Sequence, residues 1–130
     1  MGHYTDVFTE LNEPTRLLRD AIPEVWAGFG QLHKAAVADG VLPAKVKELM
    51  ALAIAVAKHC DGCIAYHAKA AARRGATAEE VAEALGVALL MDGGTASVYS
   101  PRAWDAYREF APTASTRSPV PDDEPARDVA

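Results

Sequence analysis

The amino-acid sequence predicts an all-α fold, and three observations support this prediction. Alanine, the best helix former, accounts for 27 of the 130 residues, whereas β-branched and aromatic residues are sparse. Apolar residues recur at the spacing of one helix face, and proline, glycine and capping residues separate the segments that carry this spacing. We expect a compact helical bundle in a single domain over residues 1–110.

Two helical segments are expected before the centre of the bundle. Residues 5–20 carry a first amphipathic stretch, in which Pro14 limits the regularity of the helix. Pro23 can occupy the first turn of a second helix, which stops at Asp39–Gly40. The apolar side chains that this second helix is expected to bury are Trp26, Phe29, Leu32 and Val37.

The third helix, which Pro43 opens, is expected to be the buried centre of the fold. Beyond its first turn it is apolar on nearly every face, as buried helices are. The apolar residues that recur at helical spacing along it are Val46, Leu49, Met50, Ala53, Ile54 and Ala57.

Clear start and stop signals define the next two helices. The fourth helix covers about residues 61–74 and ends at Gly75, a typical C-terminal cap. Thr77 and Glu80 form a capping box, in which the side chain of each residue accepts a hydrogen bond from the backbone N–H of the other. This box starts a fifth helix, which Gly93–Gly94 ends.

A last helical region follows, and it is expected to be interrupted or restarted at Ser100–Pro101. Its aromatic residues, Trp104, Tyr107 and Phe110, favour a place in the core or in a subunit interface. Residues 111–130 are rich in proline, serine, threonine and acidic residues. We expect this tail to be disordered or packed on a neighbouring subunit.

Composition and charge argue against several classes of partner. The chain has 13 Lys and Arg against 18 Asp and Glu, so it lacks the basic surface that phosphate binding needs, and we expect no nucleic-acid partner. The longest apolar run, residues 49–57, is far shorter than the ~20 residues of a membrane span, and the first residues have no apolar signal core. We therefore expect no membrane partner and a cytoplasmic location.

The two cysteines, Cys60 and Cys63, form a C-x-x-C pair. A loop this short constrains the unfolded chain little, so the pair is a poor structural crosslink. In a reducing compartment such pairs are more often redox-active or metal-binding. Redox activity is the favoured interpretation; a metal held with His59 and His67, or inert burial of two small side chains, is the alternative.

The position of the pair indicates how the two sulfurs differ. Asp61–Gly62 breaks the apolar pattern of the third helix, so Cys63 should lie in the first turn of the fourth. Free backbone N–H groups there stabilise a thiolate, which makes Cys63 the better nucleophile. His67 is one turn further on the same face. Cys60 is then placed to condense with an oxidised Cys63.

Glu48 is the remaining candidate site residue. A chain reversal at residues 58–61 would form a central antiparallel hairpin of the third and fourth helices that carries the C-x-x-C motif. At about 1.5 Å per residue, the reversal brings Glu48 and His67 nearly level. A proton relay from Glu48 through His67 to Cys63 is then geometrically possible. A solvated first-turn carboxylate is the alternative for Glu48. No partner can be identified for His3 or His33.

These features resemble a known family. Over about residues 25–110, the chain is similar to the carboxymuconolactone decarboxylase family, specifically its alkylhydroperoxidase D-like branch. The residues that carry the resemblance are Glu48, the apolar run 49–57, Cys60, Cys63, His67, Gly93–Gly94 and the aromatic last helix. The decarboxylase branch of the family lacks the cysteine pair.

The resemblance implies an all-α fold, often assembled as a trimer or hexamer, and thiol peroxidase chemistry. By position, it makes Cys63 the peroxidatic sulfur, Cys60 its disulfide partner, and Glu48 with His67 the proton relay. The best-known members carry a histidine directly before the second cysteine, and Gly62 stands there in this chain.

We therefore expect an oxidoreductase. It would be a thiol-dependent peroxidase that reduces alkyl hydroperoxides, or a disulfide reductase, with a role in antioxidant defence. It needs no bound metal or organic cofactor, but an external dithiol or a protein reductant must restore its thiols. The alternative is a redox-sensing module that binds a protein partner without turning over peroxide. A homo-oligomer, a trimer or a hexamer, is expected in either case.

Overall fold

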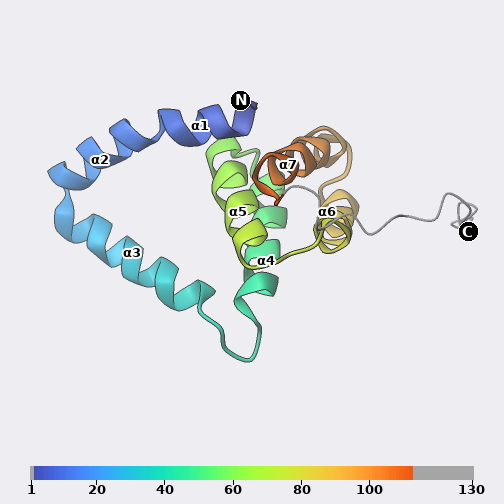
Figure 1. The fold of residues 1–130 in the computed structure, drawn as a ribbon, viewed down its shortest axis with the longest axis horizontal. Helices are drawn as coiled ribbons and strands as arrows, with labels where there is room; N and C mark the ends of the chain where they lie inside the picture. The colour runs from blue at the N-terminus through green and yellow to red at the C-terminus, as the bar shows by residue number, and fades with distance from the viewer. Residues whose placement is uncertain (1, 113–130) are drawn as a thin grey trace, which may run out of the picture.

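The computed structural model describes residues 2–112 of the chain. Within this range it contains seven α-helices, one short 3₁₀ helix and no strand, which confirms the predicted all-α fold (Figure 1). The helices are α1 (His3–Glu10), α2 (Asn12–Ala21), α3 (Pro23–Val37), α4 (Ala44–Ala57), α5 (Asp61–Arg73), α6 (Ala78–Asp92) and α7 (Ala96–Phe110), with the 3₁₀ helix η1 at Gly93–Thr95. The tail predicted at 111–130 lies, from residue 113 onward, outside the described residues.

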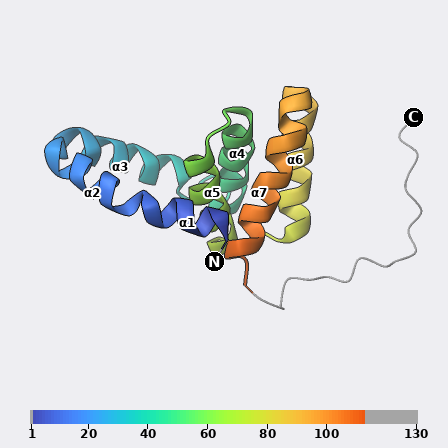
Figure 2. The ribbon, with the colours of Figure 1, turned by 90° about the horizontal axis from the view of Figure 1, so that it is seen from above.

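Helices α4 and α5 form the predicted central antiparallel hairpin, and α6 and α7 pack beside it (Figures 1 and 2). The reversal depends on His59, whose φ of 55° lies in the left-handed region. The N–H groups of His59 and Cys60 bond to the carbonyls of Val56 and Ala55, which satisfies the last turn of α4. Cys60 thereby directly precedes α5.

The core of the bundle is built largely from small side chains. Four alanines of α5 are buried, so the neighbouring helices can approach its backbone closely. They are Ala65, Ala68, Ala71 and Ala72. The larger buried side chains, such as Leu52 and Ile64, fill the space between the helices.

The face of α4 that is buried differs from the predicted one. Ala44, Glu48, Leu52, Ala55 and Val56 are the buried residues of this helix. The expectation that α4 is buried all round is therefore wrong, because Met50 and Ile54 on its other side are 50% and 54% exposed. The neighbouring helices cover only part of α4, and within one apolar helix the sequence does not show which part.

The N-terminal helix α1 is tied to both α5 and α7. The Glu109 carboxylate of α7 accepts hydrogen bonds from the backbone N–H groups of Tyr4 (3.3 Å) and Thr5 (2.8 Å) at the start of α1. Tyr4 is buried, and its hydroxyl donates to Asp61 at 3.2 Å. Burial and the Asp61 carboxylate raise the pKa of Tyr4, so the phenol keeps the proton that it donates.

Helices α2 and α3 form an arm that leaves the bundle (Figures 1 and 2). The prediction that α3 buries its apolar residues is wrong within the single chain: Phe29 and Leu32 are 59% and 65% exposed, and Trp26 and Val37 are only half-buried. These side chains are exposed because, in the tertiary fold, α3 packs mainly against short parts of α2 and α4.

The two predicted interruptions by proline have different outcomes. The first amphipathic stretch divides at Leu11, and Pro14 lies in the first turn of α2, where its missing N–H costs no helical bond. The last helix is continuous through Pro101, so the predicted break there is wrong. Tyr107 of this helix is buried, and its hydroxyl donates to the carbonyl of Ala76 at 2.6 Å.

One stretch of the described chain, Ala78–Phe110, is long and apolar enough to cross a membrane by length and composition. It is not one straight helix. Gly93, with a φ of 68°, ends α6, and α7 packs back against α6 (Figure 2). The hydrophobic residues of this stretch are therefore divided between two adjacent helices.

The predicted capping box at the start of α6 is present, with Thr77 and Glu80 bonded to each other's backbone N–H. Glu80 also pairs with Lys45 of α4 at 2.9 Å. The hydrogen bond from Lys45, with that from the Thr77 backbone, lowers the pKa of Glu80 below its ordinary value of 4.5. A carboxyl whose pKa is lowered by folding contributes its full stabilisation at pH values above its ordinary pKa. This contribution is lost as the pH falls through the lower pKa of the folded state.

We predict that Glu80→Gln lowers the free energy of unfolding at pH 7 by a few tenths of a kcal/mol, as for partly exposed ion pairs. The difference from the wild type should disappear well below pH 4.5. Urea unfolding at several pH values measures it. Glu79→Gln, an exposed glutamate of the same turn, is the matched control. A loss that is the same at every pH would contradict the ion-pair explanation.

Candidate active site

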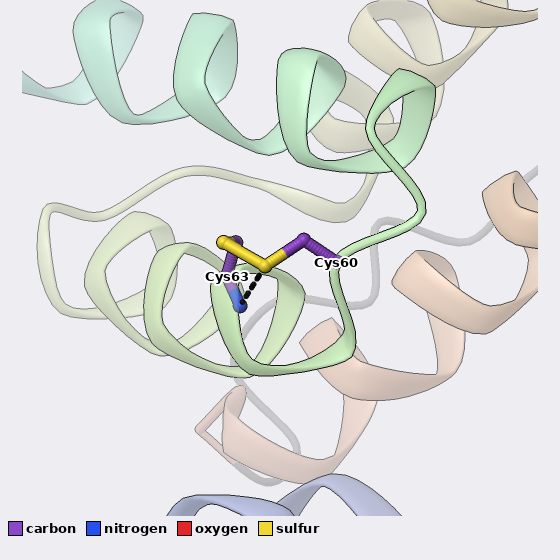
Figure 3. The surroundings of a disulfide bond; sticks show 2 residues. All are labelled: Cys60 and Cys63. Atoms are coloured by element: carbon purple, nitrogen blue, oxygen red, sulfur yellow. Dashed lines mark hydrogen bonds between the residues drawn. A yellow bond between two sulfur atoms is a disulfide. The ribbon is translucent and has the colours of Figure 1, made fainter. Parts of the chain in front are cut away.

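The two cysteines form a disulfide at the start of α5 (Figure 3). Their Cα atoms are 5.2 Å apart. Cys60 is the N-cap residue of α5, and Cys63 lies in its first turn, where the spacing predicts it. Both residues are half-buried. The pair is therefore positioned by a helix N-terminus and remains partly open to solvent.

One backbone donor distinguishes the two sulfurs. The N–H of Cys63 donates to Sγ of Cys60 at 3.2 Å, as the dashed line in Figure 3 marks. The place of Cys63 in the first turn of the helix predicts a stabilised Cys63 thiolate, whereas the N–H of Cys63 donates to the sulfur of Cys60. An N–H at a helix N-terminus stabilises a thiolate that accepts from it. Cys60 is thus a sulfur that can carry negative charge when the disulfide opens.

Glu48 and His67 form a contact across the hairpin. Nδ1 of His67 lies 2.8 Å from Oε2 of Glu48, so α4 and α5 meet at this pair. Glu48 is 2% exposed and, within residues 2–112, has no other hydrogen-bond partner. A buried carboxylate needs such a partner, which argues against the solvated alternative for Glu48. When Glu48 is ionised, Nδ1 carries the proton and Nε2 is left to accept another.

His67 follows Cys63 by one helical turn, so the two residues share a face of α5. In this disulfide form, residues 2–112 show no hydrogen bond from His67 to either sulfur. The structure therefore brings Cys60 together with Cys63 and Glu48 together with His67. The two pairs are adjacent along α5 but are not joined by a direct bond.

His33 is a residue of this region that the sequence analysis missed. Its ring lies on α3, and the centroids of the His33 and His67 rings are 6.2 Å apart. No spacing in the sequence could have indicated this, because the two histidines belong to helices that meet only through the tertiary fold.

The residues next to the cysteines are held by charged and aromatic contacts. Asp61, besides accepting from Tyr4, lies 3.8 Å from His3 and 3.9 Å from Arg102. The ring of His59 stacks on Tyr99, with centroids 4.5 Å apart. His59 lies in the predicted reversal at residues 58–61, and its ring is packed against Tyr99.

Gly62, between the two cysteines, faces the junction of α1 and α2. A Cβ atom built on Gly62 would lie 3.1 Å from Cδ1 of Leu11, which is closer than most Cβ contacts in proteins. A larger residue at this position would have to displace Leu11. Tyr66 is 42% exposed, and the centroid of its ring lies 4.8 Å from that of Phe8.

The alternative of a metal site has no geometric support in the part of the chain that the structure describes. There, no group of three or more His, Cys, Asp or Glu side chains is arranged to hold a metal ion. His59 instead contacts Tyr99 and lies 3.6 Å from Asp92, and His67 contacts Glu48.

Comparison with known proteins places these residues in a family context. The model of the carboxymuconolactone decarboxylase family matches residues 23–108, a range that includes all four candidate site residues. A crystal structure of an apo carboxymuconolactone decarboxylase family protein from Legionella pneumophila is similar, with a TM-score of 0.81 and 38% identity, over 84% of this chain and 97% of that one.

Two curated relatives are uncharacterised proteins. One, from Cupriavidus necator, is 43% identical over 95 residues, which are 73% of this chain and 84% of the relative. The other, from Haemophilus influenzae, is 38% identical over 108 residues, which are 78% of this chain and 96% of the relative.

We predict that Glu48→Ala lowers the free energy of unfolding by about 1–3 kcal/mol, because it leaves a cavity and an unpaired His67. Glu48→Gln should cost less, since the amide oxygen can still accept from Nδ1. Urea unfolding of the disulfide form measures both effects. Glu83→Ala, at an exposed glutamate of α6, is the control. A Glu48→Ala protein as stable as the wild type would contradict the buried pair.

Proposed function

Because the chain belongs to the carboxymuconolactone decarboxylase family, we propose that it is a thiol-dependent oxidoreductase of the alkylhydroperoxidase D-like branch. It reduces alkyl hydroperoxides or small disulfides and contributes to antioxidant defence in the cytoplasm. The observation that carries the proposal is the Cys60–Cys63 disulfide at the N-terminus of α5, one turn from the buried Glu48–His67 pair.

In the first step, the Cys63 thiolate attacks the terminal oxygen of the hydroperoxide. The O–O bond breaks, an alkoxide leaves, and Cys63 becomes a sulfenic acid. The alkoxide needs a proton, and His67 on the same face of α5 can supply it. Glu48 supports this role because a carboxylate on Nδ1 orients the ring and stabilises the imidazolium that carries this proton before His67 releases it.

In the second step, the Cys60 thiolate attacks the sulfenic sulfur of Cys63. The S–S bond forms, the S–O bond breaks, and the hydroxide takes a proton and leaves as water. The N–H of Cys63 supports this step because it can hold Cys60 as a thiolate before the attack.

An external dithiol or a protein reductant completes the cycle. One of its thiolates attacks Sγ of Cys63 and expels Cys60 as a thiolate, and its second sulfur then releases Cys63 and leaves the reductant as a disulfide. A stabilised thiolate is the better leaving group, so the hydrogen bond at Cys60 favours this direction of attack. The cycle needs no bound metal or organic cofactor.

Exposed apolar surface in the single chain supports a homo-oligomer. Large apolar side chains of α3, α4 and α6 are more than half exposed, which is unusual for a protein that stays monomeric. They include Val25, Phe29, Leu32, Ile54, Val87, Leu90 and Met91. We propose a trimer or a hexamer, with no membrane or nucleic-acid partner.

The same exposed surface supports the second candidate function, a redox-sensing module that binds another protein. The two functions differ in turnover. A peroxidase consumes tert-butyl or cumene hydroperoxide continuously with a dithiol reductant, whereas a sensor forms its disulfide once and changes its partner.

We predict that peroxide oxidises Cys63 first. In a Cys60→Ser protein, a sulfenic acid should accumulate on Cys63 and be trapped by dimedone, and Cys63→Ser should abolish the reaction. His67→Ala and Glu48→Gln should slow the step by ~10²-fold or more if the pair transfers the proton. Mass spectrometry locates the label. Labelling of Cys60 in the Cys63→Ser protein, with none in the Cys60→Ser protein, would reverse the two roles.

We also predict that the wild-type protein is oligomeric at micromolar concentration and that Leu32→Glu reduces its mass. The substitution places a charge on the exposed apolar face of α3. Light scattering coupled to size-exclusion chromatography measures the mass. Gln31→Glu, the neighbouring exposed position, is the matched control. A strictly monomeric wild type would contradict the proposed assembly.

A further inference from the structure

We propose that His33 of α3 exchanges protons with His67 and thereby connects to solvent the Glu48–His67 pair, whose carboxylate is buried. The inference rests on the proposed function, because it concerns proton supply to the same site. The observation behind it is the placement of the His33 ring beside the His67 ring, with 6.2 Å between centroids and 31° between planes.

The proposed chemistry must move several protons in each turnover. Each turn of the proposed cycle protonates two oxygens, that of the alkoxide and that of the departing hydroxide. Both reacting sulfurs act as thiolates, so the protons that they have lost must return through another group. His67 has one ring nitrogen, Nε2, left for this exchange, since Nδ1 is held by Glu48. For His67 to protonate both oxygens, it has to be reprotonated between the two steps.

His33 is more exposed than the pair that it approaches. Glu48 is 2% exposed, and the side chain of His67 is 22% exposed. His33, in contrast, is exposed within the single chain. An imidazole can take a proton at one nitrogen and release it at the other. Within residues 2–112 no hydrogen bond joins the two histidines, so His33 passes protons between solvent and His67 through an intervening water molecule.

The fold fixes this part of α3. His33 lies on the same side of α3 as the half-buried residues Trp26 and Val37, which are seven residues before it and four after it. The end of the arm is also tied to α4: the Asp39 carboxylate accepts from the N–H of Ala44 at 2.7 Å, and Lys47 donates to the carbonyl of Ala38 at 2.7 Å. The approach of His33 to His67 is thus set by these contacts.

The transfer moves one proton at a time and no electrons. In the direction of peroxide reduction, His33 takes a proton from water and gives it to His67, which passes it to the leaving oxygen. Within residues 2–112 no hydrogen bond joins His33 to either sulfur, so it is a positioning residue that acts through His67. It should affect the rate of turnover without changing how readily the reduced cysteines react.

The test compares two substitutions at the same position. His33→Gln removes the titrating group but keeps hydrogen bonding, and His33→Phe keeps an aromatic ring beside His67 but cannot carry a proton. We expect turnover of cumene hydroperoxide with a dithiol to fall about tenfold in both variants, below the ~10² typical of a direct general acid. Added imidazole should restore the rate of both, because a small buffer can replace the missing proton carrier.

Two controls separate proton transfer from packing. Both variants should react with iodoacetamide at the wild-type rate when their cysteines are reduced. The rate of this alkylation depends on the fraction of cysteine present as thiolate and needs no proton donor for a leaving oxygen. Gln31→Ala, at an exposed position of the same helix, should keep wild-type turnover and gain nothing from imidazole. Wild-type turnover in His33→Phe together with reduced turnover in His33→Gln would show that only the aromatic ring matters. That result would overturn the proposal.

The failure of this inference is distinguishable from the failure of the proposed function. If the wild type turns over hydroperoxide or a small disulfide while His33→Gln has the same rate and pH profile, the role of His33 is refuted and the function stands. If the wild type turns over neither class of substrate with any dithiol, the proposed function fails and the role of His33 fails with it.

Discussion

The tight reversal between α4 and α5 is the constraint on which the site depends. His59 adopts a left-handed conformation that costs a residue with a side chain about 1–2 kcal/mol, and two hydrogen bonds close the end of α4 around it. The stacking of its ring on Tyr99 helps to offset this cost. Only Lys58 and His59 lie between the last residue of α4 and Cys60, which is the N-cap residue of α5. The sulfur of Cys60 accepts a backbone hydrogen bond there.

The alanine-rich core determines what the two helices of the hairpin can do together. Small side chains such as Ala65 and Ala68 let α4 and α5 lie close, and Glu48 then reaches Nδ1 of His67 across the interface. A buried carboxylate with one partner is costly unless that partner is positioned in advance. The same packing that stabilises the bundle therefore orients the imidazole one turn from Cys63.

The arm of α2 and α3 adds a second level of organisation. Its apolar face is exposed in the single chain, whereas Trp26 and Val37 are half-buried and the His33 ring lies beside that of His67. This element thus contributes little to the core of its own chain. The histidine that it places beside His67 is exposed, whereas Glu48 is buried.

The sequence by itself determined the features that depend on neighbours within a few residues. Helix content, the capping box at Thr77 and Glu80, the glycine that ends α6 and the C-x-x-C pair at a helix start are of this kind, because local backbone hydrogen bonds control them. The reversal could also be predicted, and with it the approach of Glu48 to His67.

Only the tertiary structure decided which faces are covered and which distant residues meet. The buried face of α4, the exposed face of α3 and the contact of His33 with His67 all depend on where other helices lie. The direction of the Cys63 N–H toward the sulfur of Cys60 depends on the bend of the chain at the N-cap. Helical periodicity shows that a face is apolar, but the neighbour that covers it is set by long-range packing, which no local pattern contains.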